Sequence, residues 1–276
     1  VGYTALTANT GAQNTAVGSG ALATNTSGTP NTAVGYYAPN LNNTTSNNTA
    51  VGANAAQSVI TGNNTAVGKS ALAAASGADS SAVGYIALAA NTGAQNTAIG
   101  SGALTANTSG TPNTAIGYDA LQTNTTGANN TALGALALQN NSGGNNTAVG
   151  KGTLSGANAT SDSTAIGYLA LNANTNSNNT SIGSSALQNN TTAIGSTAVG
   201  YAALNQNNGD GNTALGDAVL STNGAGMRNS ALGSSALYFN DTGDDNTAIG
   251  HQALYTNNTG TTNTAIGIYA LSSNAD

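Results

Sequence analysis

The chain has 276 residues and a formal net charge of −6, with three basic side chains against nine acidic ones. This balance excludes recognition of the phosphate backbone of nucleic acids. Aromatic residues occupy only 4% of positions and 37 residues are Gly, so the large side chains of a thick globular core are scarce. A thin core that extends along the chain is indicated instead.

One short motif, Asn-Thr-Ala-Val-Gly at residues 14–18, organises the whole chain. Versions of it return every 16 or 17 residues. Its glycine occurs at Gly2, Gly18, Gly35, Gly52, Gly68, Gly84, Gly100, Gly117, Gly134, Gly150, Gly167, Gly183, Gly200, Gly216, Gly233, Gly250 and Gly267. A short fixed period that combines Gly with β-branched residues is typical of solenoids. We predict an all-β fold, a parallel β-solenoid (β-roll) of about 17 coils, each of 16–17 residues.

Each coil is predicted to contain two short strands and two bends. In the first strand Thr15 and Val17 share one face and Ala16 the other, because side chains alternate along a strand. We expect Val17 and its equivalents to form one core column, and Leu22, in an Ala-Leu pair read as the second strand, to begin another. A polar arc rich in turn formers closes the coil. The alternative, a helical solenoid, requires repeats about twice as long.

Stacking of the coils in register aligns asparagines into two ladders whose amides can hydrogen-bond along the solenoid. One ladder contains Asn14, Asn31, Asn48, Asn64, Asn96, Asn113 and Asn130, and the other contains Asn91, Asn107, Asn124, Asn174, Asn207 and Asn257. We interpret both as structural; turn formation alone and ligand binding are the alternatives.

A longer period of five coils shows in the residue after each motif glycine, which runs Tyr, Ser, Tyr, Ala and Lys before it repeats. We interpret residues 1–276 as a single repetitive solenoid with superrepeats at about 1–82, 83–165 and 166–276, the last degenerate. Lys69 and Asp79, like Lys151 and Asp162, stand at matching positions where an ion pair within the coil can form. Duplicated blocks suit a spacer or a multivalent surface, and not an enzyme.

Residues that carry chemistry are sparse. The chain has one histidine, His251, and no Cys or Glu, so no nucleophile, base and orienting group form a recognisable set. Asp241, Asp244 and Asp245 offer oxygen ligands but lack the alternating carboxylates of a calcium loop, and we read them as a solvated turn. We predict no catalytic, cofactor or metal site.

Five tyrosines beside the motif glycine are the candidate surface-contact residues: Tyr36, Tyr85, Tyr118, Tyr168 and Tyr201. An exposed ring at this corner could stack on a sugar. The alternative is that the ring packs against a neighbouring coil or subunit, and we favour this second interpretation.

The motif Asn-Thr-Ala-Val/Ile-Gly followed by Ala-Leu resembles the head repeats of YadA-like trimeric autotransporter adhesins. It is also similar to repeats of bacterial and phage tail-fibre proteins. The resemblance covers all the coils, although the coil here is longer than the family's. It implies a left-handed homotrimer on the cell or virion surface that attaches to host or matrix surfaces. Host-surface glycans are candidate partners because of the tyrosines, and no membrane insertion of this segment is expected because it has no run of 18 apolar residues.

The sequence therefore indicates a non-catalytic structural and adhesive segment of an extracellular or virion fibre that presents a repetitive polar surface. A self-assembling extracellular filament is one alternative. An ice-binding solenoid is another, because stacked threonines form a column, but Thr15 would point inward if it shares a core face with Val17. We expect subunits to meet along the Ala16, Gly18 and Ala21 columns, whose small side chains allow close approach; the number three comes from the resemblance alone.

Overall fold

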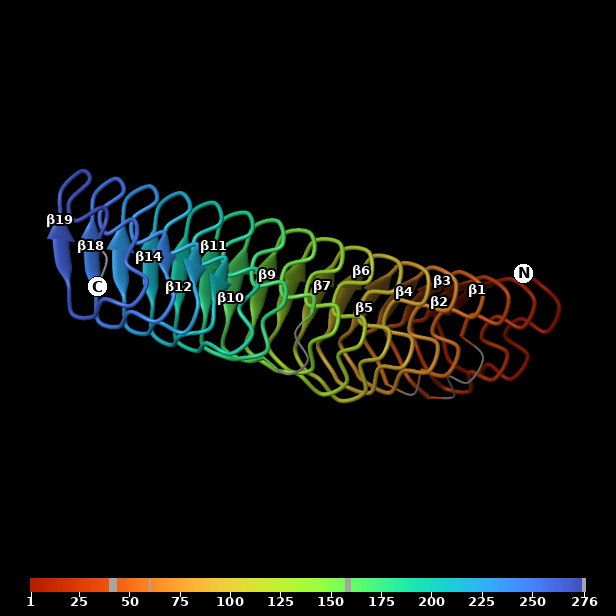
Figure 1. Cartoon of the computed structure of the whole chain (residues 1–276). Helices are drawn as coiled ribbons and strands as arrows, with labels where there is room; N and C mark the ends of the chain where they lie inside the picture. The colour runs from red at the N-terminus through yellow and green to blue at the C-terminus, as the bar shows by residue number, and fades with distance from the viewer. Residues whose placement is uncertain (40–43, 60, 157–159, 275–276) are drawn as a thin grey trace. The chain divides into compact units, whose positions relative to one another are not determined.

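The computed structural model describes residues 1–39, 44–59, 61–156 and 160–274. The chain comprises two compact units, Val1–Gly143 and Gly144–Asp276. In the described residues both units consist of strands, turns and bends without a helix, and in each unit the coils stack in succession (Figure 1). The predicted all-β parallel solenoid is confirmed.

Each motif copy from residue 15 onward contributes a three-residue strand to a parallel sheet. In the first unit the strands are β1 (Thr15–Val17), β2 (Thr32–Val34), β3 (Thr49–Val51), β4 (Thr65–Val67), β5 (Ser81–Val83), β6 (Thr97–Ile99), β7 (Thr114–Ile116) and β8 (Thr131–Leu133). Neighbouring strands pair without offset, so that Thr97, Ala98 and Ile99 lie beside Thr114, Ala115 and Ile116.

The second unit repeats this sheet and adds a smaller one. The main strands are β9 (Thr147–Val149), β10 (Thr164–Ile166), β11 (Thr180–Ile182), β12 (Thr197–Val199), β14 (Thr213–Leu215), β16 (Ser230–Leu232), β18 (Thr247–Ile249) and β19 (Thr264–Ile266). The smaller sheet contains β13 (Gln206–Asn207), β15 (Thr222–Asn223) and β17 (Phe239–Asn240), also parallel.

The strand side chains alternate as predicted, but in the opposite sense. Ala16 is 6% exposed and faces the interior, whereas Val17 is 45% exposed and faces outward with Thr15. The predicted Val17 core column is therefore wrong. The coil is narrow, and a Leu from the segment opposite the strand already fills its interior. Because large and small side chains must alternate across a close-packed core, only the methyl group of an Ala fits across from that Leu.

The same finding corrects the predicted subunit interface. Ala16 and Ala21 lie inside the chain's own coil, where Ala21 is fully buried, and they pack with Leu22. The Leu column is confirmed as core, and its fully buried members are Leu22, Leu72, Leu88, Leu104, Leu121, Leu138, Leu154, Leu171, Leu187, Leu204, Leu220, Leu237 and Leu254.

The Ala-Leu segment, predicted as a second strand, is a turn. Leu104 has φ 49° and Leu121 has φ 51°, in the left-handed region that non-glycine residues seldom occupy. The backbone N–H of Leu104 donates to the carbonyl of Ala120 in the next coil at 3.0 Å, and that of Leu121 donates to Ala137 at 3.0 Å. Burial of the Leu and the bonds between coils hold this conformation against its local cost. The backbone of this segment must reverse direction within a few residues, and two residues in the extended conformation of a strand cannot do so.

This conformation gives a prediction for the Leu column. Leu104→Ile should destabilise the coil by about 2 kcal/mol or more, because a β-branched side chain is strained at positive φ and must also repack. Leu104→Met keeps an unbranched Cβ and should cost less than about 1.5 kcal/mol. Urea unfolding followed by circular dichroism measures both. Equal costs would contradict the left-handed conformation of this column.

Both asparagine ladders are present. In the first, the backbone N–H of Asn113 donates to Oδ1 of Asn96 at 2.8 Å, and that of Asn130 donates to Oδ1 of Asn113 at 2.9 Å. In the second, Nδ2 of Asn107 donates to Oδ1 of Asn91 at 2.6 Å. All five residues are buried. Buried amides must be hydrogen-bonded, so these contacts fix the register between coils. The structural interpretation of the ladders is confirmed.

Candidate functional site

The most extensive candidate surface is the outward face of the main strands, with a row of Thr or Ser beside a row of Val, Ile or Leu. In the first unit Val17, Val34, Val51, Val83, Ile99 and Leu133 are 36–46% exposed. No charged residue occurs in any of these strands. Each unit thus exposes on the order of 500 Å² of aliphatic surface, at the upper end of the largest apolar patch on a typical monomer.

The face is hollowed in the second unit. A depression of about 240 Å³ lies over three successive strands and is lined by Leu215, Leu232 and Ile249 with Thr213 and Thr247. Its walls are aliphatic side chains and threonines, without a charged group. Such a depression suits an apolar side chain of another molecule better than a polar ligand.

The five candidate tyrosines border this face, each two residues after an outward aliphatic side chain. All are 53–62% exposed. No two of the five rings contact one another in the described residues, although Tyr36 packs against Tyr37 with ring centroids 4.3 Å apart. A hydrogen bond to Asp119 raises the pKa of the Tyr118 phenol. The tyrosines are thus separate exposed rings, and their role in surface contact stays a prediction.

The structure does not gather the three clustered aspartates into one site. Asp245 accepts a hydrogen bond from Nε of Arg228 at 2.7 Å, and Oδ2 of Asp244 lies 3.8 Å from Nη2 of the same guanidinium. The bond to Arg228 lowers the pKa of Asp245 and raises that of Arg228. Asp241 lies elsewhere, in the groove described below. No cluster of three His, Cys, Asp or Glu side chains suited to a metal occurs in the described ranges.

The predicted ion pairs of the fifth coils are wrong. Asp79 accepts a hydrogen bond from Nδ2 of Asn63 at 2.9 Å, and Asp162 accepts one from Asn145 at 2.9 Å. Within the part of the chain that is described, Lys69 and Lys151 form no ion pair. The aspartates bond to neighbouring coils because stacked positions are closer than positions across a coil.

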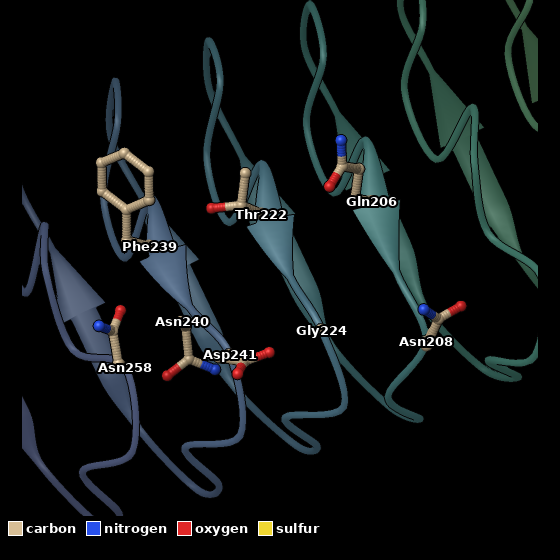
Figure 2. Close-up of a pocket in the computed structure, with 8 residues that line it drawn as sticks. All are labelled: Gln206, Asn208, Thr222, Gly224, Phe239, Asn240, Asp241 and Asn258. Carbon is tan, nitrogen blue, oxygen red and sulfur yellow. The ribbon is translucent and has the colours of Figure 1, made fainter.

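A polar groove in the second unit was not anticipated from the sequence. It lies over β13, β15 and β17 and is lined by Gln206, Asn208, Thr222, Gly224, Phe239, Asn240, Asp241 and Asn258 (Figure 2). One signal was available, since Phe239 is the chain's one phenylalanine and stands where other coils carry polar or small residues.

His251 is exposed, and its ring packs edge-on against Tyr269 with centroids 5.4 Å apart. No helix in the described residues is long and apolar enough to cross a membrane. In comparisons with known proteins, no family model, curated protein or solved structure matches the chain.

Proposed function

We propose that this chain is a non-catalytic structural segment of a fibre on a cell or virion surface, which assembles from copies of itself and presents a repetitive polar surface for attachment. The observation that carries the proposal is the outward aliphatic row, with Ile99 42% exposed on an uncharged face. Such a row is unfavourable in water and is stabilised when a partner covers it.

A second copy of the chain is the occupant that fits this face best. Within each unit the rows repeat in register from strand to strand and carry no charge, so two or three identical faces can meet without like-charge repulsion. In each unit the aliphatic row, on the order of 500 Å², comes near the roughly 800 Å² that each partner contributes to a standard interface when the threonines beside it are included. The number three and the left-handed sense come from the resemblance to YadA-like heads. The Ala columns take no part, because they are buried within each coil.

The attachment surface lies on the polar arcs away from this face. Ser109 and Thr108 are exposed there, and the same arc recurs in successive coils. Repetition multiplies weak contacts with a glycan or matrix surface. The dense stacking and the absence of a recognisable catalytic set in the sequence support a structural role over an enzymatic one.

Self-association is tested with Ile99→Lys combined with Ile116→Lys. We expect sedimentation velocity to show assembly of the wild type and dissociation of the variant, because charge would be buried at the interface. The variant should keep its β-type circular dichroism spectrum, since both side chains point outward. Ser109→Lys, on the exposed arc, is the control and should assemble like the wild type. A wild-type chain that sediments as a folded monomer would contradict the proposal.

Ice binding is the second candidate. The objection to it was that the threonine column would point into the core, and in the structure this column faces outward. Thr97 and Ile99 both face outward and repeat in register from strand to strand, which gives a regular array. The same sedimentation experiment separates the candidates when thermal hysteresis is measured on the same sample. A monomer with thermal hysteresis favours ice, whereas an assembly without it favours the fibre.

A further inference from the structure

We propose that the groove over β13, β15 and β17 binds one pyranose ring of a neutral saccharide. The groove is a hollow of about 290 Å³ within the second unit. That volume is at the lower limit of small-molecule sites, which restricts the occupant to about one ring. This inference rests on the attachment role proposed above and names its ligand class.

The hollow arises because one coil carries small outward residues between two coils with larger ones. Figure 2 shows Gln206, Thr222 and Phe239 in one row across the coils, with Asn208, Gly224 and Asp241 in a second row beside it. The first row follows the strand register, which pairs Gln206 with Thr222 and Thr222 with Phe239. Thr222 and Gly224 therefore form the floor, and their neighbours form the walls.

Gly224 leaves room for the carboxylate of Asp241 beside the floor of the groove. Its backbone is outside the left-handed region, so glycine is not required there for conformation. A Cβ at this position would lie 2.2 Å from Oδ1 of Asp241, which shows that the carboxylate reaches over the glycine. A side chain at this position would push the Asp241 carboxylate out of its place at the edge of the groove.

One wall is a fixed aromatic ring. Phe239 is 40% exposed, although it is the kind of residue that is usually buried. Its ring packs edge-on against Tyr238 at 4.6 Å and against Tyr255 at 5.4 Å, and the two tyrosines stack on each other at 5.5 Å. These contacts hold the Phe239 ring in place before a ligand arrives, which lowers the entropic cost of binding.

The other walls supply hydrogen-bonding groups of both kinds. Oδ1 of Asn208 accepts from Oγ1 of Thr191 at 2.7 Å, and its amide nitrogen has no partner among the described residues. The side chains of Gln206, Asp241 and Asn258 also make no hydrogen bond to any residue that the structure describes. The groove thus offers amide donors and a carboxylate acceptor around an aromatic face.

This combination matches a sugar better than other small ligands. Sugar hydroxyl groups both donate and accept hydrogen bonds, and the C–H face of a pyranose is apolar enough to lie on an aromatic ring. The lining contains Asp241 and no cationic side chain, which disfavours phosphates, sulfated glycans and other anions. The carboxylate can accept from two neighbouring hydroxyls.

The test uses the methyl α- and β-glycosides of glucose, galactose, mannose and N-acetylglucosamine as probes, with saturation-transfer-difference NMR followed by titration. We expect at least one of them to bind the wild-type chain. Phe239→Ala and Gly224→Ala should each weaken that binding by roughly tenfold or more. Tyr269→Ala, which removes another exposed ring of the same unit, is the matched control and should bind like the wild type.

Absence of binding by every probe, or undiminished binding by Phe239→Ala, would overturn the inference. So would a loss confined to Tyr269→Ala, because the sugar would then lie on an exposed ring outside the groove. Sedimentation velocity of the same variants reports whether they still assemble, so that a failure of sugar binding can be told apart from a failure of the proposed assembly. Phe239 belongs to the smaller sheet and not to the strand rows, so Phe239→Ala should assemble normally. Failure of sugar binding in a normal assembly refutes only the groove.

Discussion

Ala98→Asp is expected to unfold the coils around β6, whereas Ile99→Asp, one residue further along the same strand, is expected to leave them folded. Ala98 is fully buried and faces the interior, so the substitution buries a charge without a partner and also overfills a close-packed space. We expect a loss of roughly 4 kcal/mol or more in the free energy of unfolding. Ile99 points outward, and Ile99→Asp should cost less than about 1 kcal/mol in the monomer.

Urea unfolding followed by circular dichroism measures both changes, at a protein concentration low enough for the wild type to be dissociated. The concentration matters because assembly itself stabilises the folded chain by mass action. A larger loss for Ile99→Asp than for Ala98→Asp would restore the inward Val17 column and contradict the packing of the strands.

Gly100→Ala is expected to have the second large effect. Gly100 directly follows β6 and has φ 138°, and a Cβ there would lie 2.2 Å from the carbonyl oxygen of Gly117 in the next coil. The methyl group would meet rigid backbone, so the two coils would have to separate and lose hydrogen bonds on both sides. We expect a loss of about 3 kcal/mol or more in the free energy of unfolding, measured as above.

Gly195→Ala is the matched control. Gly195 also has a positive φ, of 67°, but no atom lies within 4 Å of an added Cβ. Its substitution should lower the free energy of unfolding by only about 1 kcal/mol, because the positive φ is the only feature that disfavours an alanine there. If both variants lose the same stability, backbone conformation and not the close approach of coils explains the motif glycine.

The sequence predicts those features of the coil that depend on period alone. The recurrence of Asn96 and Asn113 places them in one ladder, and that of Leu104 and Leu121 places them in one column, whatever the shape of the coil. Alternation places Thr97 and Ile99 on a common face, but it does not say whether that face is inside. The width of the coil decides this, and the width depends on how the opposite wall turns.

That turn is hidden from the sequence because its central residue is a leucine. A glycine or asparagine at positive φ is a recognisable signal, whereas Leu104 at φ 49° is held there by burial and by bonds to the next coil. An Ala-Leu pair therefore reads as a strand. The reversed faces and the misplaced interface both follow from this one error.

The candidate sites were predictable to different degrees. The position of Tyr85 and Tyr118 at an exposed corner follows from the motif. The groove depends on which side chains stand beside Gly224 in the coils before and after it, in a block where the five-coil period has degenerated. The sequence does not predict that neighbourhood until the register of β13, β15 and β17 is known.

Cysteine cross-linking tests the outward aliphatic face as an assembly surface most directly. The chain has no cysteine of its own, so Ile99→Cys introduces a single reactive thiol on this face. Under mild oxidation at low protein concentration, we predict a covalent dimer of Ile99→Cys and almost none of Ser109→Cys, whose thiol lies on the exposed arc. Failure of Ile99→Cys to cross-link, or equally fast cross-linking of Ser109→Cys, would contradict the assembly of copies through this face.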